Sequence, residues 1–149
     1  MSQEDGSVFV YNLTKETFLA YRAKVADSIL TRLVGLIGKR SLEPHSGLWI
    51  VPSCGIHTLG MLFDIDVIYL NRDLKVVGVH ELVPPFWMTP INLQAESVLE
   101  LPSHTIFKSR TEVGDQLQIS SSDSMAESDG ELHKEPAKLN GIQKVVAGP

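Results

Sequence analysis

A histidine and two aspartates interrupt an apolar stretch of the chain, CGIHTLGMLFDIDVIYLN at residues 54–71. His57, Asp64 and Asp66 each cost free energy when they leave water without a partner, so a stretch that only packs a core has no use for them. They are paired, solvated or functional. An imidazole held by a carboxylate is a usable general base, because the carboxylate orients the ring and raises its basicity. His57 and Asp66 are therefore the candidate catalytic residues.

The same two residues are the centre of a predicted ligand site. A guanidinium from Arg32 or Arg40 beside them, at the mouth of a small barrel or sheet end, suits an anionic or polar small molecule. The loop VPPFWMTP at residues 83–90 adds large apolar side chains, which either plug the open end of the sheet or form a lid or partner contact. The predicted ligand-binding set is Arg32, Arg40, His57, Met61, Asp66 and Trp87.

A structural explanation competes with the ligand site. In a strand over residues 64–71, Asp66 shares one face with Ile68 and Leu70, because side chains alternate with a period of two. A buried aspartate needs a hydrogen-bonded partner, and the guanidinium of Arg32 on a predicted helix suits a carboxylate. An Arg32–Asp66 ion pair inside the fold is therefore the alternative.

Two motifs with familiar spacings do not develop into sites. Cys54 and His57 are spaced as a C-x-x-H half-site, but no second closely spaced pair accompanies them. The glycines of GLIGKRS at residues 35–41 are too close together for a phosphate loop, so Gly38 is interpreted as a helix terminator. We expect no metal ion and no cofactor, and no activated nucleophile is evident.

Composition limits the class of protein. The 149 residues are 43% hydrophobic and 21% charged, which is typical of one soluble globular domain. A formal net charge of -5 argues against nucleic-acid binding. The single cysteine cannot form an internal disulfide, the N-terminus lacks the basic residues of a secretory signal, and no apolar run reaches the roughly 20 residues that span a membrane. We expect a cytoplasmic protein with no membrane contact.

The elements that must position these residues are mainly strands. Alternating apolar and β-branched residues predict strands over 8–13 and 17–25, and a hairpin over 64–71 and 74–83 with its turn at 71–73. Apolar residues at helical spacing predict one helix from Asp27 to Ile37, capped by Asp27. The further elements expected are a strand at 48–52, the AESVLELP segment at 95–102, a helical or turn segment at 105–109 and a last strand at 113–120.

This pattern predicts a mainly β (β-rich α+β) fold, either a small barrel or two packed antiparallel sheets with one short helix over an open edge. Residues 1–119 form the predicted single domain. The composition of residues 120–149, rich in Ser, Asp, Glu, Lys and Gly, predicts a disordered tail, because it cannot bury enough apolar surface to offset the ordering entropy.

An ordered set of sequence blocks resembles a known family. The blocks are RLVGLIGKRSL, GLWIVP, CGIHTLGMLFDIDVIYLN, VPP, AESVLELP and VGDQLQI, and together they cover residues 25–119. In this order and spacing they resemble domain of unknown function 192, also called uncharacterised protein family 0127. The resemblance implies a compact, mainly β domain and names no reaction or cofactor. The positions that match it are Arg32, Gly35, Leu36, Arg40, Gly47, His57, Gly60, Met61, Asp66, Glu100, Leu101, Gly114 and Asp115.

The chain departs from the family pattern at two positions. Leu62 stands where similar sequences carry a basic residue, and Asp64 stands where they carry proline. The leading hypothesis is a binding module for a small polar or anionic ligand or a peptide. The alternatives are a hydrolase or lyase that uses His57 and Asp66 as its base, and a purely structural interaction domain.

Overall fold

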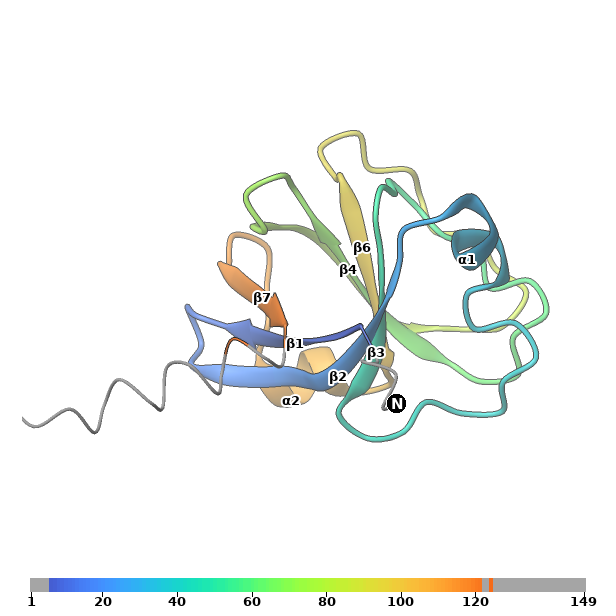
Figure 1. The fold of residues 1–149 in the computed structure, drawn as a ribbon, viewed down its shortest axis with the longest axis horizontal. Coiled ribbons are helices and arrows are strands. Elements are labelled where there is room, and N and C mark those ends of the chain that lie inside the picture. Colours follow the sequence, from blue (N-terminus) through green and yellow to red (C-terminus); the bar gives the residue numbers. More distant parts are fainter. Residues whose placement is uncertain (1–5, 122–123, 125–149) are drawn as a thin grey trace, which may run out of the picture.

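One seven-stranded sheet forms the body of the protein (Figure 1). The structure is a computed structural model that describes residues 6–121 and 124. The strands occur in the sheet in the order β5-β4-β6-β3-β2-β1-β7. Their bounds are β1 Ser7–Asn12, β2 Thr17–Ala26, β3 Ser46–Ile50, β4 Ile65–Leu70, β5 Val76–Val83, β6 Ser97–Pro102 and β7 Leu117–Ser121.

The sheet curls into a half-barrel because its two edge strands meet at one end. The N–H of Val76 donates to the carbonyl of Asp115 at 2.9 Å, and the N–H of Leu117 donates to the carbonyl of Leu74 at 3.0 Å. The hairpin β4–β5 is antiparallel, as predicted, and β1 and β2 form a second antiparallel hairpin. Strands β2 and β3 pair in parallel, which the long connection with a helix between them allows. The prediction of a mainly β fold is confirmed, and the half-barrel replaces the alternative of two packed sheets.

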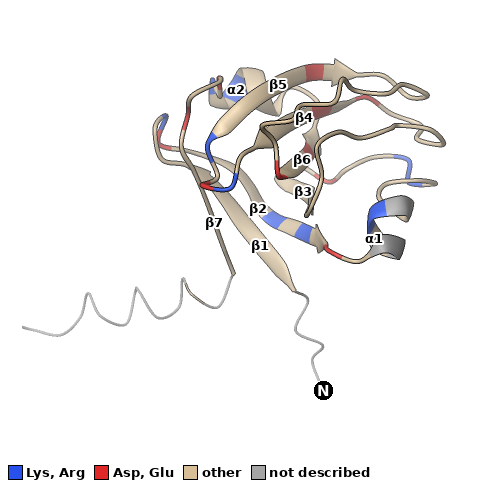
Figure 2. Cartoon of the chain, turned by 90° about the horizontal axis from the view of Figure 1, so that it is seen from above, with Lys and Arg blue, Asp and Glu red and all other residues tan. Residues whose placement is uncertain are grey.

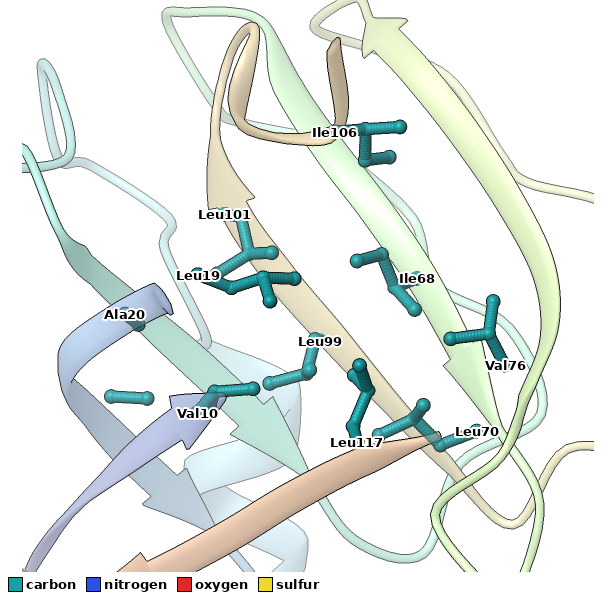
Figure 3. Packing of buried hydrophobic residues seen from close by; sticks show 11 residues of the cluster. Val10, Leu19, Ala20, Ile68, Leu70, Val76, Leu99, Leu101, Ile106 and Leu117 are labelled. Carbon is teal, nitrogen blue, oxygen red and sulfur yellow. The ribbon is translucent and has the colours of Figure 1, made fainter. Parts of the chain in front are cut away.

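Two apolar clusters cover the two faces of the sheet. Alternation along β4 sends Ile68 and Leu70 into one cluster and Ile65, Val67 and Tyr69 into the other, as predicted for this strand. Figure 3 shows the first cluster, in which side chains from the two sides of the curl point toward one another. The second cluster lies on the opposite face of β3, β4 and β6, and it borders the candidate site described below.

The first helix, α1, is shorter than predicted. It spans Ile29–Val34, and a capping box formed by Ser28 and Thr31 starts it in place of the predicted cap Asp27. Gly35 ends it with a φ of 45°, three residues before the predicted terminator Gly38. The apolar spacing therefore continues beyond the helix into a series of turns.

The remaining predicted elements are found close to their expected positions. The segment at 105–109 is a second short helix, α2 (Thr105–Ser109), which packs against β2 and β5. The last strand, β7, reaches Ser121 and so crosses the predicted boundary at residue 119. The rest of the predicted tail, except Ser124, lies outside the described residues. Neither described helix is long and apolar enough to cross a membrane.

Gly47 allows β3 to lie close against β6. A Cβ atom at this position would lie 2.9 Å from the carbonyl oxygen of Glu100 and 2.9 Å from Cδ2 of Leu101. We expect Gly47→Ala to lower the free energy of unfolding by about 1–3 kcal/mol, since the strands must move apart. Denaturant unfolding measures the loss. Gly6→Ala is the control, because its Cβ would meet nothing within 4 Å, and equal stability of the two variants would contradict the prediction.

Candidate functional site

A cavity with a volume of about 260 Å³ opens between α1, the segment that follows β3, and the face of β6. Leu36, Ile50 and Met61 form its buried apolar wall. An apolar cavity of about 150 Å³ accepts a molecule the size of benzene, so this cavity has room for a small organic ligand. Its titratable residues are Arg32, His57 and Glu100.

Glu100 is a carboxyl group inserted into an apolar layer. It lies in β6, opposite Leu48 of β3 and Val67 of β4, and both neighbours belong to the second apolar cluster. Glu100 is 3% exposed. An apolar residue at this position would pack at no cost in polar desolvation, so the carboxyl group is unfavourable for the fold.

Two residues that line this cavity each have a buried polar atom without a hydrogen-bond partner. Among the residues that the structure describes, three buried side-chain atoms have no hydrogen-bond partner: Trp49 Nε1, His57 Nδ1 and Glu100 Oε2. His57 and Glu100 both line the cavity. Buried polar groups are nearly always paired, so two orphans in one cavity need an explanation such as a bound ligand.

Burial raises the pKa of Glu100 to about 8, well above the usual value for a glutamic acid. At neutral pH the cavity therefore presents a protonated carboxyl group, which can donate one hydrogen bond and accept others. Carboxyl groups with strongly raised pKa values occur often at functional sites.

The segment that contains His57 is hydrogen-bonded to the connection between β5 and β6. His57 and Met88 form an isolated antiparallel bridge. The N–H of Thr58 donates to the carbonyl of Trp87 at 2.8 Å, and the buried hydroxyl of Thr58 donates to the carbonyl of Pro84 at 2.6 Å. The backbone of this loop therefore fixes the wall that carries His57.

The large apolar side chains of the same loop do not line the cavity. Phe86, Trp87 and Met88 are 66%, 57% and 71% exposed, so the prediction that they plug the sheet is wrong. Trp87 lines a separate hollow beside β5, with His80 and Glu81. Trp87, a residue of the predicted ligand-binding set, therefore does not line the cavity that holds His57.

Asp66 lies on the other face of the sheet from the cavity. It is fully buried, and its Oδ1 accepts the N–H of Leu82 at 3.1 Å while its Oδ2 accepts the N–H of Ile106 at 2.8 Å. Asp66 does not line the cavity that holds His57. The predicted pairing of His57 with Asp66 is wrong, because Asp66 shares the face of Ile68 whereas the cavity opens on the face of Val67.

The two predicted arginines occupy different places. Arg32 lines the cavity, but its Nη1 donates to the carbonyl of Pro52 at 3.0 Å and its Nε to the carbonyl of Ser28 at 3.3 Å. The predicted Arg32–Asp66 ion pair is therefore wrong, since backbone groups satisfy both side chains. Arg40 is exposed and does not line the cavity.

No metal centre emerges in residues 6–121 and 124, where groups of three His, Cys, Asp or Glu side chains do not come together as a metal ion requires. Cys54, the first residue of the C-x-x-H half-site, is exposed. Of the predicted ligand-binding set, the cavity brings together Arg32, His57 and Met61.

Comparison with protein families identifies the fold. Residues 10–119 match the model of DUF192, which is described as "Uncharacterized ACR, COG1430". The chain belongs to DUF192. This confirms the family resemblance of the sequence blocks, and the matched range contains every residue that lines the cavity.

Two relatives that match most of their own length to this chain carry equally general names. UPF0127 protein PF1050 of Pyrococcus furiosus is 29% identical over 112 residues, which cover 72% of this chain and 94% of that protein. UPF0127 protein PH1112 of Pyrococcus horikoshii is 29% identical over 115 residues, which cover 73% and 96%.

Two crystal structures share the DUF192 fold of this chain. A protein of unknown function from Novosphingobium aromaticivorans has a TM-score of 0.66 and 17% identity, with 75% of this chain and 83% of that one covered. The structure named "a putative transcription regulator" from Sinorhizobium meliloti has a TM-score of 0.64 and 19% identity, with 75% and 91% covered. At these identities the likeness establishes the fold alone.

The central residue of this DUF192 cavity, Glu100, was not among the predicted site residues. The segment VLELP carries the signal that could have found it, since in a strand Glu100 shares a face with Val98. That argument singled out Asp66 in its own strand, and it applies equally to Glu100 once residues 97–102 are recognised as β6.

Proposed function

We propose that this DUF192 domain is a binding module that holds a small molecule in the cavity between α1 and β6. The ligand has an apolar body and one polar head group. Leu36, Ile50 and Met61 contact the body, and Glu100 and His57 receive the head group.

The observation that carries the proposal is the orphaned carboxyl group of Glu100 in an apolar layer. A polar group that destabilises the empty fold is a common feature of binding sites, where function and stability conflict. The cavity also has the usual composition of a ligand site, with apolar walls and a few convergent polar groups.

A role in DNA binding is the alternative that the name of the S. meliloti structure raises. The charges of this chain oppose it, because 18 acidic residues outnumber 13 basic ones. In Figure 2 the basic and acidic positions are interspersed along the elements. The cavity therefore supports a small ligand better than a nucleic acid.

Blocking the cavity is expected to abolish ligand binding. Fragments of up to about ten non-hydrogen atoms, screened against the ¹⁵N-labelled full chain, should shift the backbone amides of residues 32–37, 50–51 and 53–57. Ile56→Trp fills the cavity from its wall and should remove these shifts. The measurement is the amide chemical shift of each protein during titration.

Val113→Trp is the matched control, because Val113 is 60% exposed and lines none of the hollows described above. It should leave the fragment shifts unchanged. The proposal fails if no fragment shifts the cavity amides, or if Ile56→Trp binds the same fragments with the same shifts.

A further inference from the structure

Among the residues that the structure describes, Glu100 forms no ion pair. In the described part of the chain, the ion pairs join Lys15 to Glu112 and to Asp115, and none of these three residues lines the cavity. An ionised carboxylate in an apolar layer without a counter-charge is strongly unfavourable. A cation from outside would remove this penalty.

The elements packed around Glu100 contribute few charges to its face. β3 contributes Leu48 and Ile50, and β4 contributes Val67 and Tyr69. The other titratable groups that line the cavity are Arg32 from α1 and His57 from the segment after β3.

Arg32 does not take the role of counter-charge. Its Nη1 and Nε donate to the carbonyls of Pro52 and Ser28, and its side chain is only partly buried, so solvent screens its charge. The Nδ1 atom of His57 is buried without a hydrogen-bond partner, so the imidazole is not hydrogen-bonded to Glu100 through this atom. The negative charge of an ionised Glu100 thus remains uncompensated in the cavity.

We propose that the cavity binds an organic ammonium ion, in which a primary amine on a compact apolar body places its N–H groups against Glu100. This inference rests on the function proposed above and names the ligand class of the same site. The apolar wall of Leu36, Ile50 and Met61 excludes water from the ion pair, which strengthens the attraction between ammonium and carboxylate.

Binding of such a ligand releases a proton. In the empty cavity burial raises the pKa of Glu100 to about 8, so the carboxyl group is protonated at neutral pH. When the ammonium ion binds, the carboxyl group gives its proton to water and the ammonium donates a hydrogen bond to the resulting carboxylate. The affinity for an amine must therefore rise with pH until Glu100 is ionised in the empty protein. A neutral ligand gains nothing from ionisation of Glu100, and an anionic ligand is repelled by it.

Three probes of similar shape separate these cases: benzylamine, benzyl alcohol and benzoate. Each is titrated into the full chain at about pH 6, pH 7 and pH 8, and the dissociation constant is taken from the amide shifts of residues that line the cavity. The expected result is that benzylamine binds about tenfold more tightly at pH 7 than at pH 6, as release of one proton requires, with a smaller further gain at pH 8, where Glu100 begins to ionise in the ligand-free protein. Benzyl alcohol should show no such rise, and benzoate should weaken.

Variants assign the pH dependence to one group. Glu100→Gln should remove both the pH dependence and the preference for benzylamine over benzyl alcohol. Glu81→Gln, which neutralises an exposed carboxylate on β5, should keep both. In His57→Gln the rise with pH should persist, because the titrating group is Glu100 and not the imidazole.

Each other outcome overturns the inference in a distinguishable way. Equal, pH-independent affinity for benzylamine and benzyl alcohol at the cavity amides refutes the ammonium ligand and leaves the proposed binding module intact. Preference for benzoate would show that Arg32 binds the polar head group of the ligand, and it would also refute the ammonium ligand. If none of the three probes shifts the cavity amides at tens of millimolar, and the fragment screen also fails, both proposals are wrong.

Discussion

Glu100→Gln is expected to stabilise the protein, by an amount that grows as the pH rises from about 5 to about 8. Burial raises the pKa of Glu100 to about 8 in the folded chain, whereas a glutamic acid in an unfolded chain has a pKa of about 4.3. Between these values the folded state binds one proton more than the unfolded state. Each pH unit in this window therefore lowers the free energy of unfolding of the wild type by about 1.4 kcal/mol.

Glutamine has a similar shape but cannot ionise, so the free energy of unfolding of the variant does not fall with pH for this reason. The difference between Glu100→Gln and the wild type should reach on the order of 4 kcal/mol between about pH 5 and pH 8. Urea unfolding at a series of pH values measures it. The amide of the glutamine remains a buried polar group, but this adds only an offset that does not depend on pH.

Glu81→Gln provides the comparison, because Glu81 is exposed and its replacement should give a difference that is small at every pH. A difference for Glu100→Gln that stays constant from about pH 5 to pH 8 would show that the carboxyl group is not desolvated, and the basis for both proposals above would be lost.

The periodicity of the sequence predicted the strands and their faces well. Alternation in β4 correctly placed Asp66 with Ile68 and Leu70, because the alternation of side chains between the two faces of a strand depends only on local backbone geometry. The hairpin of β4 and β5 followed from the short polar turn between them.

The residues that form the site were harder to predict from the sequence, because the site depends on contacts between distant segments. The sequence indicates that Asp66 and Glu100 each interrupt an apolar strand, but not which face of the sheet carries a cavity. In the fold these two residues point to opposite faces of the sheet, so the choice of Asp66 as the partner of His57 failed. The parallel pairing of β2 with β3, which places α1 above the cavity, has no local signal either.

The early end of α1 has a physical reason that local spacing does not reveal. Apolar residues continue at helical intervals to Ile37, yet Gly35 adopts a φ of 45° and turns the chain. Leu36 is then buried against the second apolar cluster, and its side chain becomes part of the cavity wall. Tertiary packing of Leu36 thus outweighs the helical preference of the segment.

Asp66 is a buried carboxylate of the opposite kind to Glu100, because the protein satisfies both of its oxygens. The ladder between β4 and β5 is irregular opposite Asp66, which leaves the N–H of Leu82 without a carbonyl in the sheet. Oδ1 of Asp66 accepts that N–H. Oδ2 accepts the N–H of Ile106 at the start of α2, where the cap residue His104 makes no side-chain hydrogen bond.

Asp66→Ala is therefore expected to lower the free energy of unfolding by about 3–5 kcal/mol, because the buried N–H of Ile106 and the partly buried N–H of Leu82 lose their hydrogen bonds at once. Asp64→Ala, two residues earlier and exposed, should change it by less than about 0.5 kcal/mol. Hydrogen exchange should show faster opening of the Leu82 and Ile106 amides in Asp66→Ala alone. Equal stability of the two variants would show that Asp66 does not hold α2 against the sheet. Glu100→Gln should instead raise the free energy of unfolding. The two replacements therefore distinguish a carboxyl group that stabilises the fold, Asp66, from one that destabilises it and is retained for binding, Glu100.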